Sequence, residues 1–281
     1  MENWKYDESN AEFWDYLCGM NSVLTLGFDV STREGIDHFD DWYFDFYPYL
    51  KVYLEEVLVG KESVLEIGLG LGTVSRYLSE RVERYVGLDV AANVVNFNNS
   101  EFVRRGLNGK CIHGSILDPK IDEKFDLVIA IGSLHHTGDF NKALKNAFSL
   151  MSEEGQLLIM IYNEFSLFNW IHFPKKTFRA YLDFRLSGIK QWDEVFAEIR
   201  AVNDSNLQGV AAPSTSYFHK NVFKDYGEIF NQNWKIQIRN TNNLRVFRNI
   251  FINRNLILNN LARICGTDIY AISSSKANRI K

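Results

Sequence analysis

Short apolar segments alternate with longer amphipathic ones along the central part of the chain. Five such segments have the length and apolar character of strands, at residues 63–67, 84–88, 110–113, 125–131 and 155–162. Three segments between them carry apolar side chains at helical spacing, at residues 73–81, 92–105 and 140–151. This alternation predicts an α/β fold with a parallel sheet, right-handed crossovers and helices on both faces. In such sheets, ligands bind beyond the carboxyl ends of the strands.

The segments on either side of this region have a different pattern. In residues 1–60, Phe39, Tyr43 and Phe46 recur at helical spacing, which predicts amphipathic helices packed on the main domain. The later part is predicted to contain a helical, aromatic segment at 165–206, a loop at 211–216, a helix at 221–230, strands at 234–239 and 268–273, and an amphipathic helix at 244–264. The two late strands are expected to join the sheet.

Composition places the chain among globular proteins of a reducing compartment. Apolar residues make up 46% of the 281 residues and charged residues 23%, and we find no apolar run long enough to span a bilayer. The N-terminus lacks the basic start and apolar stretch of a signal peptide, and three cysteines are widely spaced. We therefore expect a cytoplasmic protein that does not associate with membranes.

Charge is distributed unevenly along the chain, although the net charge is only −4. Residues 1–56 hold thirteen Asp and Glu against three basic residues, whereas residues 231–281 hold nine Lys and Arg against Asp268 alone. The two ends are expected to pack together or to pair between the subunits of a homodimer. Alternatively, Arg245, Arg248 and Arg254 attract an anionic substrate. The overall acidity argues against a nucleic-acid partner.

A glycine-rich turn follows the first predicted strand, in the sequence Glu66-Ile67-Gly68-Leu69-Gly70-Leu71-Gly72-Thr73. Glycines permit left-handed backbone angles and close approach of backbone N–H groups to a ligand, and the next helix adds partial positive charge. The G-x-G-x-G spacing differs from the dinucleotide pattern G-x-G-x-x-G, and no second mononucleotide-binding half follows. These details favour a methyltransferase over a nicotinamide enzyme, although such turns occur in both.

Four segments in order resemble the motifs of class I S-adenosylmethionine-dependent methyltransferases. They are Val64–Thr73, Tyr85–Asp89 with its terminal acid, Phe125–Thr137 with Leu-His-His near its end, and Leu150–Leu157 before the fifth strand. The Leu-His-His segment is similar to that of the subgroup that includes ubiquinone-biosynthesis methyltransferases. The resemblance covers about residues 61–163.

This resemblance implies a Rossmann-like fold with a seven-stranded, mostly parallel sheet and helices on both faces. The segments would be an N-terminal helical lid (1–60), the S-adenosylmethionine-binding core (61–163), a helical cap insertion (164–220) and a C-terminal completion of the sheet (221–281). The implied cofactor contacts are Glu66, Gly68, Gly70, Gly72, Asp89, Ser115, Ile116 and Gly132. Asp89 would bind the ribose hydroxyls. Ser115 stands where many relatives carry an Asp near the adenine.

Two histidines, His135 and His136, follow the strand at residues 125–131 and would face the cleft. Because histidine titrates near neutrality, one of them, with His136 preferred, is a candidate general base for a hydroxyl nucleophile. Alternatively, both hold the loop through ring hydrogen bonds. No third ligand at suitable spacing points to a metal site. The candidate substrate contacts, implied by the position of the fifth strand and the cap, are Tyr162, Asn163, Tyr217 and His219.

The sequence therefore predicts an S-adenosylmethionine-dependent methyltransferase that acts on a small molecule, at a hydroxyl oxygen. A sugar, a nucleotide-linked sugar or another secondary metabolite fits a site closed by a lid, because the lid would exclude water and large acceptors. Two alternatives remain open. They are an NAD-dependent oxidoreductase and a catalytically inactive methyltransferase fold that serves as a partner subunit.

Overall fold

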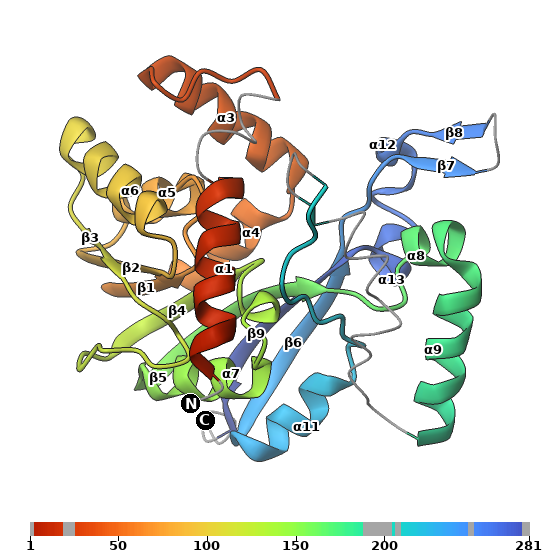
Figure 1. Cartoon of the computed structure of the whole chain (residues 1–281). Helices are drawn as coiled ribbons and strands as arrows, with labels where there is room; N and C mark the ends of the chain where they lie inside the picture. Colours follow the sequence, from red (N-terminus) through yellow and green to blue (C-terminus); the bar gives the residue numbers. More distant parts are fainter. Residues whose placement is uncertain (1–2, 19–25, 188–203, 206–208, 247–249, 277–281) are drawn as a thin grey trace.

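In the computed structural model, the chain is described except for residues 1–2, 19–25, 188–203, 206–208, 247–249 and 277–281. A seven-stranded sheet with the order β3-β2-β1-β4-β5-β9-β6 runs through its centre (Figure 1). Its strands are β1 (Ser63–Ile67), β2 (Arg84–Asp89), β3 (Lys110–His113), β4 (Phe125–Ile131), β5 (Met151–Tyr162), β6 (Gln232–Arg239) and β9 (Asp268–Ser275). Strands β1 to β5 pair in parallel, and β9 runs antiparallel to β5 and β6. The predicted mostly parallel sheet is confirmed.

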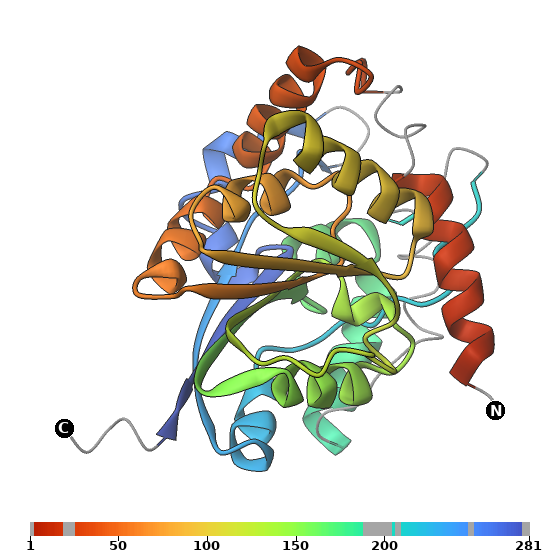
Figure 2. The same cartoon turned by 90° about the vertical axis from the view of Figure 1, so that its left-hand side faces the viewer.

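Helices cover both faces of the sheet (Figure 2). One face is covered by α4 (Leu50–Leu58), α5 (Thr73–Ser79) and α6 (Ala92–Arg105), and the other by α7 (Phe140–Ser149) and α11 (Val222–Ile229). Side chains of one strand point alternately to opposite faces, so Val64 joins the core under α4 to α6 while Leu65 joins the core under α7 and α11. The sheet is thus buried on both sides.

Helix α7 shows how the sequence produces this packing. Its buried residues Phe140, Ala143, Leu144 and Ala147 recur at three- and four-residue spacing, so they form one apolar stripe against the sheet. The helix begins after Asp139, whose side chain accepts the backbone N–H of Lys142. It therefore starts close behind the turn that carries the two histidines.

The order of the strands reverses at β1, because β2 follows it on one side and β4 lies on its other side. The connections from β1 and from β4 therefore lead to opposite faces of the sheet, which leaves a crevice at the carboxyl ends of these two strands. The glycine-rich turn follows β1, and the short 3₁₀ helix η1 (Leu134–His136) follows β4. Both predicted motifs border this crevice.

The C-terminal part corrects one prediction. Residues 244–264 do not form one amphipathic helix: they contain β7 (Leu244–Val246), β8 (Ile250–Ile252), α12 (Arg254–Ile257) and the start of α13 (Ala262–Cys265). Two physical reasons account for this. The β-branched Val246, Ile250 and Ile252 favour the β7–β8 hairpin. The side chain of Asn253 accepts the N–H of Asn255, which starts a new, short helix.

The segment after β5 is helical in part. It contains α8 (Leu167–His172) and α9 (Pro174–Ser187), as predicted for residues 165–206, whereas residues 188–203 lie outside the described part of the chain. Asp204 and Ser205 are not helical, because Ser205 pairs with Ala211 in an isolated antiparallel bridge. Asp204 lies beside the sheet, because its side chain accepts the hydroxyl of Tyr162 on β5 at 3.1 Å.

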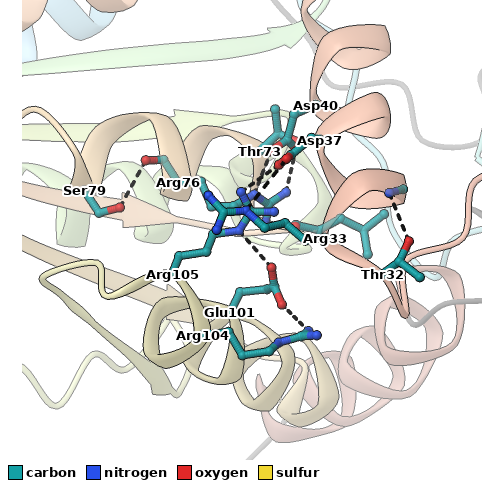
Figure 3. Close-up of polar contacts among 12 residues, drawn as sticks. Thr32, Arg33, Asp37, Asp40, Thr73, Arg76, Ser79, Glu101, Arg104 and Arg105 are labelled. Atoms are coloured by element: carbon teal, nitrogen blue, oxygen red, sulfur yellow. Dashed lines mark hydrogen bonds and ion pairs between the residues drawn. The ribbon is translucent and has the colours of Figure 1, made fainter.

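The N-terminal region contributes α1 (Asn3–Cys18) and α3 (Arg33–Phe46), which are held on the core by acidic side chains. On α1, Asp15 accepts the backbone and side-chain N–H groups of Asn93, both at 2.8 Å. On α3, Asp40 accepts two hydrogen bonds from Arg76 at 2.5 and 2.7 Å and one from Thr73 at 2.6 Å (Figure 3). These contacts connect the α3 helix directly to the helix that begins at the glycine-rich turn.

The oppositely charged ends of the chain also meet. Lys235 on β6 forms an ion pair with Glu56 on α4 at 2.7 Å. The Arg254 guanidinium donates to the carbonyl oxygen of Phe46 at 2.6 Å and to Asn240 at 2.8 Å. Contact between the ends within one subunit therefore accounts for part of the uneven charge. Among the described residues, no helix combines the length and apolar character needed to cross a bilayer.

Candidate functional site

A cavity of about 570 Å³ lies at the carboxyl ends of β1, β2, β4 and β5. Its core-side lining includes Glu66, Ile67, Gly68, Leu69, Gly70, Leu71, Thr73, Leu88, Asp89, Val90, Gly114, Ser115, Ile116, Ile131, Gly132, Ser133, His136, Met160 and Tyr162. The N-terminal region adds Asn10, Trp14, Leu26, Phe39, Trp42, Tyr43, Phe46 and Tyr47. The segment after α9 adds Asp204 and Ser205. Residues of the N-terminal region and of the segment after α9 therefore line the cavity together with the strand ends.

The three glycines of the turn share a positive φ but differ in their surroundings. All have positive φ, at 80° for Gly68, 51° for Gly70 and 79° for Gly72. A Cβ on Gly68 would lie 2.3 Å from the Cβ of Ser133, and one on Gly72 would lie 1.6 Å from Oδ1 of Asn98. A Cβ on Gly70 would meet no atom within 4 Å. Gly68 and Gly72 therefore allow close packing, whereas the backbone at Gly70 borders the open cavity.

Asp89 ends β2 and holds the turn in place. Its Oδ2 accepts the backbone N–H of Leu69 at 2.7 Å, and its Oδ1 accepts that of Ala91 at 2.8 Å. Burial raises the pKa of the Asp89 carboxyl, although the backbone N–H groups act in the opposite direction. Each carboxylate oxygen keeps acceptor capacity beyond these bonds. Asp89 is placed at the cavity wall, where a hydroxyl-bearing ligand can reach it.

Glu66 lies beneath the turn and also contributes to the cavity wall. Burial raises the pKa of its carboxyl to about 8, against the opposing effect of a hydrogen bond from Tyr85. The Tyr85 hydroxyl donates to Glu66 at 2.5 Å. The site therefore contains a carboxyl group that is largely protonated at neutral pH and that a nearby positive charge would ionise.

The other predicted cofactor contacts fall in two places. Ser115, Ile116 and Gly132 line the cavity, and the Ser115 hydroxyl accepts the N–H of Leu117 at 3.0 Å. Gly72 lies outside the lining, where it precedes the first residue of α5. It acts on the site through the shape of the turn.

His136 lines the cavity and is 4% exposed. Its Nδ1 lies 3.0 Å from the hydroxyl oxygen of Thr215 and 3.3 Å from the carbonyl oxygen of Ser214. The Trp14 ring packs on the imidazole with 4.6 Å between ring centroids. Burial lowers the pKa of His136, while the charge of Asp204 and the Ser214 carbonyl act to raise it. At neutral pH the ring is available as a neutral base.

His135 has a different environment and does not line the cavity. It is 1% exposed, and its ring lies between those of His136 and Tyr162, at 4.1 and 4.3 Å. Neither ring nitrogen has a hydrogen-bond partner in the described part of the chain. Burial, together with the neighbouring His136, holds its pKa well below the usual value. His135 therefore supports His136 as a neutral packing group, and of the two histidines only His136 can reach a ligand.

The four predicted substrate contacts differ in whether they line the cavity. Tyr162 lines the cavity and donates its hydroxyl to Asp204 at 3.1 Å. The Asn163 side chain donates to the backbone carbonyl of Gly266 at 2.7 Å, and the Tyr217 ring packs near that of Tyr162 at 5.7 Å. His219 accepts the N–H of Asn221 at 3.3 Å. Asn163, Tyr217 and His219 are not among the lining residues.

Sequence reasoning missed several residues of the site, and Asp204 and Thr215 are two of them. Both are buried, at 5% and 1% exposure, and Thr215 donates to Asp204 at 3.2 Å. Thr215 lies in the predicted loop at 211–216, and Asp204 lies in a segment that was expected to be helical. No local motif marks either residue, because Thr215 is 79 positions away from its partner His136 and Asp204 is 42 positions away from its partner Tyr162.

Comparison with known proteins identifies the central segment. Residues 65–159 match the family described as "Methyltransferase domain". A ubiquinone biosynthesis O-methyltransferase of Coxiella burnetii is 26% identical over 135 residues, which cover 47% of this chain and 52% of that protein. The alignment thus spans about half the length of the curated relative. The match agrees with the predicted methyltransferase family over residues 65–159.

Solved structures agree on the fold. A SAM-dependent methyltransferase of Methanosarcina mazei superposes with a TM-score of 0.53 at 14% identity, over 79% of this chain and 96% of that chain. The N-methyltransferase NodS of Bradyrhizobium japonicum, in complex with S-adenosyl-L-homocysteine, gives 0.51 at 13% identity, over 84% and 92%. The predicted Rossmann-like class I fold is confirmed.

Proposed function

We propose that this chain, whose residues 65–159 match the methyltransferase domain family, transfers a methyl group from S-adenosylmethionine to a hydroxyl oxygen of a small molecule. The observation that carries the proposal is the charge of the cavity. Its described lining contains three carboxyl groups, on Glu66, Asp89 and Asp204, and neither lysine nor arginine. A cavity of this kind suits a cationic ligand.

The sulfonium of S-adenosylmethionine is such a cation. Carboxylates attract it, and the aromatic faces of the lid offer cation–π contacts. NAD carries a pyrophosphate, and the described lining offers its negative charge the N-terminus of α5 but no lysine or arginine, beside three carboxyl groups that would repel it. The same argument disfavours a nucleotide-linked sugar as the acceptor. Arg254, one of the arginines considered for an anionic substrate, lies outside the described lining and donates to Phe46 and Asn240.

The residues at the carboxyl ends of β1 and β2 fit the cofactor. Gly70 and Asp89 line the cavity and would supply donors and acceptors for its amino-acid and ribose parts, and Ser115 and Ile116, which also line the cavity, would border its adenine. A cavity of this volume is within the range of about 300 to 1,000 Å³ found for ligand sites. It accommodates the cofactor together with a modest acceptor.

The acceptor side is the end of the cavity around His136. Trp14 and Tyr162 lie near its ring, at 4.6 and 5.6 Å between centroids, and Tyr47 also lines the cavity. Flat aromatic walls with few polar groups favour an acceptor that carries a ring, such as a phenolic metabolite, over a free sugar. The curated relative with ubiquinone biosynthesis in its name supports this class of acceptor.

The cofactor supplies an electrophilic methyl group next to a positive sulfur. The chain supplies the base and the environment. His136 removes the hydroxyl proton, because only an oxygen that is losing its proton attacks a methyl group well. Trp14 and the other aromatic residues of the N-terminal region exclude water, so that the developing charges meet fixed groups of the protein. Positioning of the two reactants supplies most of the remaining rate.

Mass spectrometry after incubation with S-adenosylmethionine tests the proposal directly. The acceptor set contains phenols and catechols, hexoses and a nucleotide-linked sugar. We expect a phenolic acceptor to exchange one hydrogen for one methyl on oxygen. Methylation of none of these compounds, with S-adenosylhomocysteine nevertheless bound, would leave the inactive partner subunit as the better explanation.

A further inference from the structure

We infer that Asp204 and Thr215 are positioning residues that fix the direction of the proton on His136. They hold the ring with its hydrogen on Nδ1 and leave Nε2 without a proton, facing the cavity as the acceptor of the substrate hydroxyl proton. This inference rests on the proposed function. It assigns two residues from outside the matched methyltransferase segment to the same reaction.

Asp204, Thr215 and His136 form a hydrogen-bonded relay. The direction of each hydrogen bond in this relay follows from the chemistry of the donor and acceptor groups. The Ser214 carbonyl oxygen accepts only, so Nδ1 at 3.3 Å must carry the hydrogen. The Thr215 hydroxyl donates to Oδ2 of Asp204 at 3.2 Å, which leaves its oxygen to accept from Nδ1 at 3.0 Å. A neutral imidazole with hydrogen on Nδ1 has its lone pair on Nε2.

The relay is anchored by the backbone on both sides. The N–H of Ser216 donates to the carbonyl oxygen of His135 at 2.8 Å, which joins the loop to the histidine turn. The N–H of Ala212 donates to the carbonyl oxygen of Asp204 at 2.7 Å. Asp204 also accepts the Tyr162 hydroxyl at 3.1 Å, so its carboxylate is fixed by side chains from two segments. The loop and the aspartate therefore move together with the base.

The surroundings of His136 determine what the Asp204 charge does. Within 6 Å, ring to ring, lie His135 from the same turn, Tyr162 from β5 and the uncharged Trp14 from α1. Burial disfavours the imidazolium form and lowers the pKa of His136, whereas the negative charge of Asp204 favours that form. Asp204 thus stabilises the ring after the proton arrives.

The proton balance of the step is simple. The O–H bond of the acceptor breaks as a hydrogen forms a bond to Nε2, and the oxygen electron pair forms the new bond to the methyl carbon. The carbon–sulfur bond breaks with its electron pair on sulfur. His136 becomes an imidazolium, whose Nδ1–H remains bonded to Thr215. The proton is released to solvent when the products leave.

Nitrogen-15 NMR of the histidine side chains tests the relay in the protein without substrate. The signals of His136, among six histidines, are assigned by comparison with His136→Gln. We expect the native ring to show a protonated Nδ1 and a bare Nε2. In Asp204→Asn, we expect the pKa of His136 to fall and the population with the hydrogen on Nε2 to rise. In Thr215→Val, the pKa of His136 should also fall and the population with the hydrogen on Nε2 should also rise. In Thr215→Ser, which keeps the hydroxyl group, both quantities should match those of the native protein.

Kinetics supply the second measurement. A base must be unprotonated, so turnover rises as the pH passes upward through the pKa of His136. In Asp204→Asn this rise should move to lower pH, while the plateau falls by about 10-fold or more. Thr215→Ser should stay within about threefold of the native plateau. A purely structural role would lower turnover equally at every pH.

The two proposals fail in distinguishable ways. If the native protein transfers no methyl group, the proposed function fails, yet the NMR measurement still tests the relay. If native His136 carries its hydrogen on Nε2, the relay is wrong. The relay is also wrong if Asp204→Asn and Thr215→Val, folded by circular dichroism, leave the tautomer and the pKa of His136 unchanged.

Discussion

Oδ2 of Asp89 lies 2.7 Å from the backbone nitrogen of Leu69, and this contact joins the end of β2 to the glycine-rich turn after β1. The carboxylate therefore shapes the turn and at the same time borders the cavity. The same side chain is placed to hold the turn and to bind the ligand.

Replacement of Asp89 should weaken cofactor binding. In Asp89→Ala the turn loses its acceptor at Leu69, and the ligand loses a charged hydrogen-bond partner worth about 1.5 to 3 kcal/mol. We expect the Kd for S-adenosylhomocysteine to rise by about 10- to 100-fold. Isothermal titration calorimetry measures the change. Asp118→Ala is a suitable control, because Asp118 is exposed and does not line the cavity. An unchanged Kd in Asp89→Ala would remove Asp89 from the binding site.

The contact of α3 with α5 should dominate the stability of the N-terminal region. Asp40→Ala leaves the Arg76 guanidinium, whose side chain is 4% exposed, without its carboxylate. Loss of one partner of a buried ion pair costs about 3 to 5 kcal/mol. Arg33→Ala removes a solvent-exposed ion pair to Asp37 and should change the free energy of unfolding by less than about 1 kcal/mol. Urea denaturation compares the two, and equal effects would contradict the structure.

The buried Glu66 should make stability fall as pH rises. Its pKa is about 8 in the folded protein and 4.5 as the reference for an exposed carboxyl. Between these values the folded state binds one more proton than the unfolded state, so the free energy of unfolding decreases with pH by about 1.4 kcal/mol per unit from this group. Glu66→Gln should flatten the curve between about pH 5 and 8, and Glu83→Gln, on the exposed surface, should not. If the free energy of unfolding depended on pH in the same way in the native protein and in Glu66→Gln, the raised pKa of Glu66 would be refuted.

His136 should affect turnover more than cofactor binding. General-base catalysis contributes about 10²- to 10⁴-fold. His136→Gln should therefore lower kcat by at least about 100-fold, while the Kd for S-adenosylhomocysteine stays within about threefold. A loss of kcat below about threefold would show that positioning alone supplies the rate.

The sequence predicted the parts of the site that depend on neighbouring residues in the chain. Gly68, Asp89 and His136 each lie at or shortly after the end of a strand whose apolar pattern is clear, so their common position at one edge of the sheet could be predicted. Asp204 and Thr215 could not, because their place is set by long-range hydrogen bonds to His136 and Tyr162.

The failed helix at 244–264 has a related cause. Its apolar spacing fits a helix as well as a hairpin, and the decision is made by β-branched residues and by the Asn253 cap. The local pattern of apolar residues was therefore sufficient to predict the central strands. The structure of the later segments depends on tertiary contacts that this pattern does not contain.

Calorimetric titration with S-adenosylhomocysteine and with NAD, on the same protein preparation, tests the central claim most directly. We predict saturable binding of S-adenosylhomocysteine with a Kd in the range of about 1 µM to 1 mM typical of enzyme ligands, and no heat of binding with NAD. Binding of NAD without binding of S-adenosylhomocysteine would contradict the account.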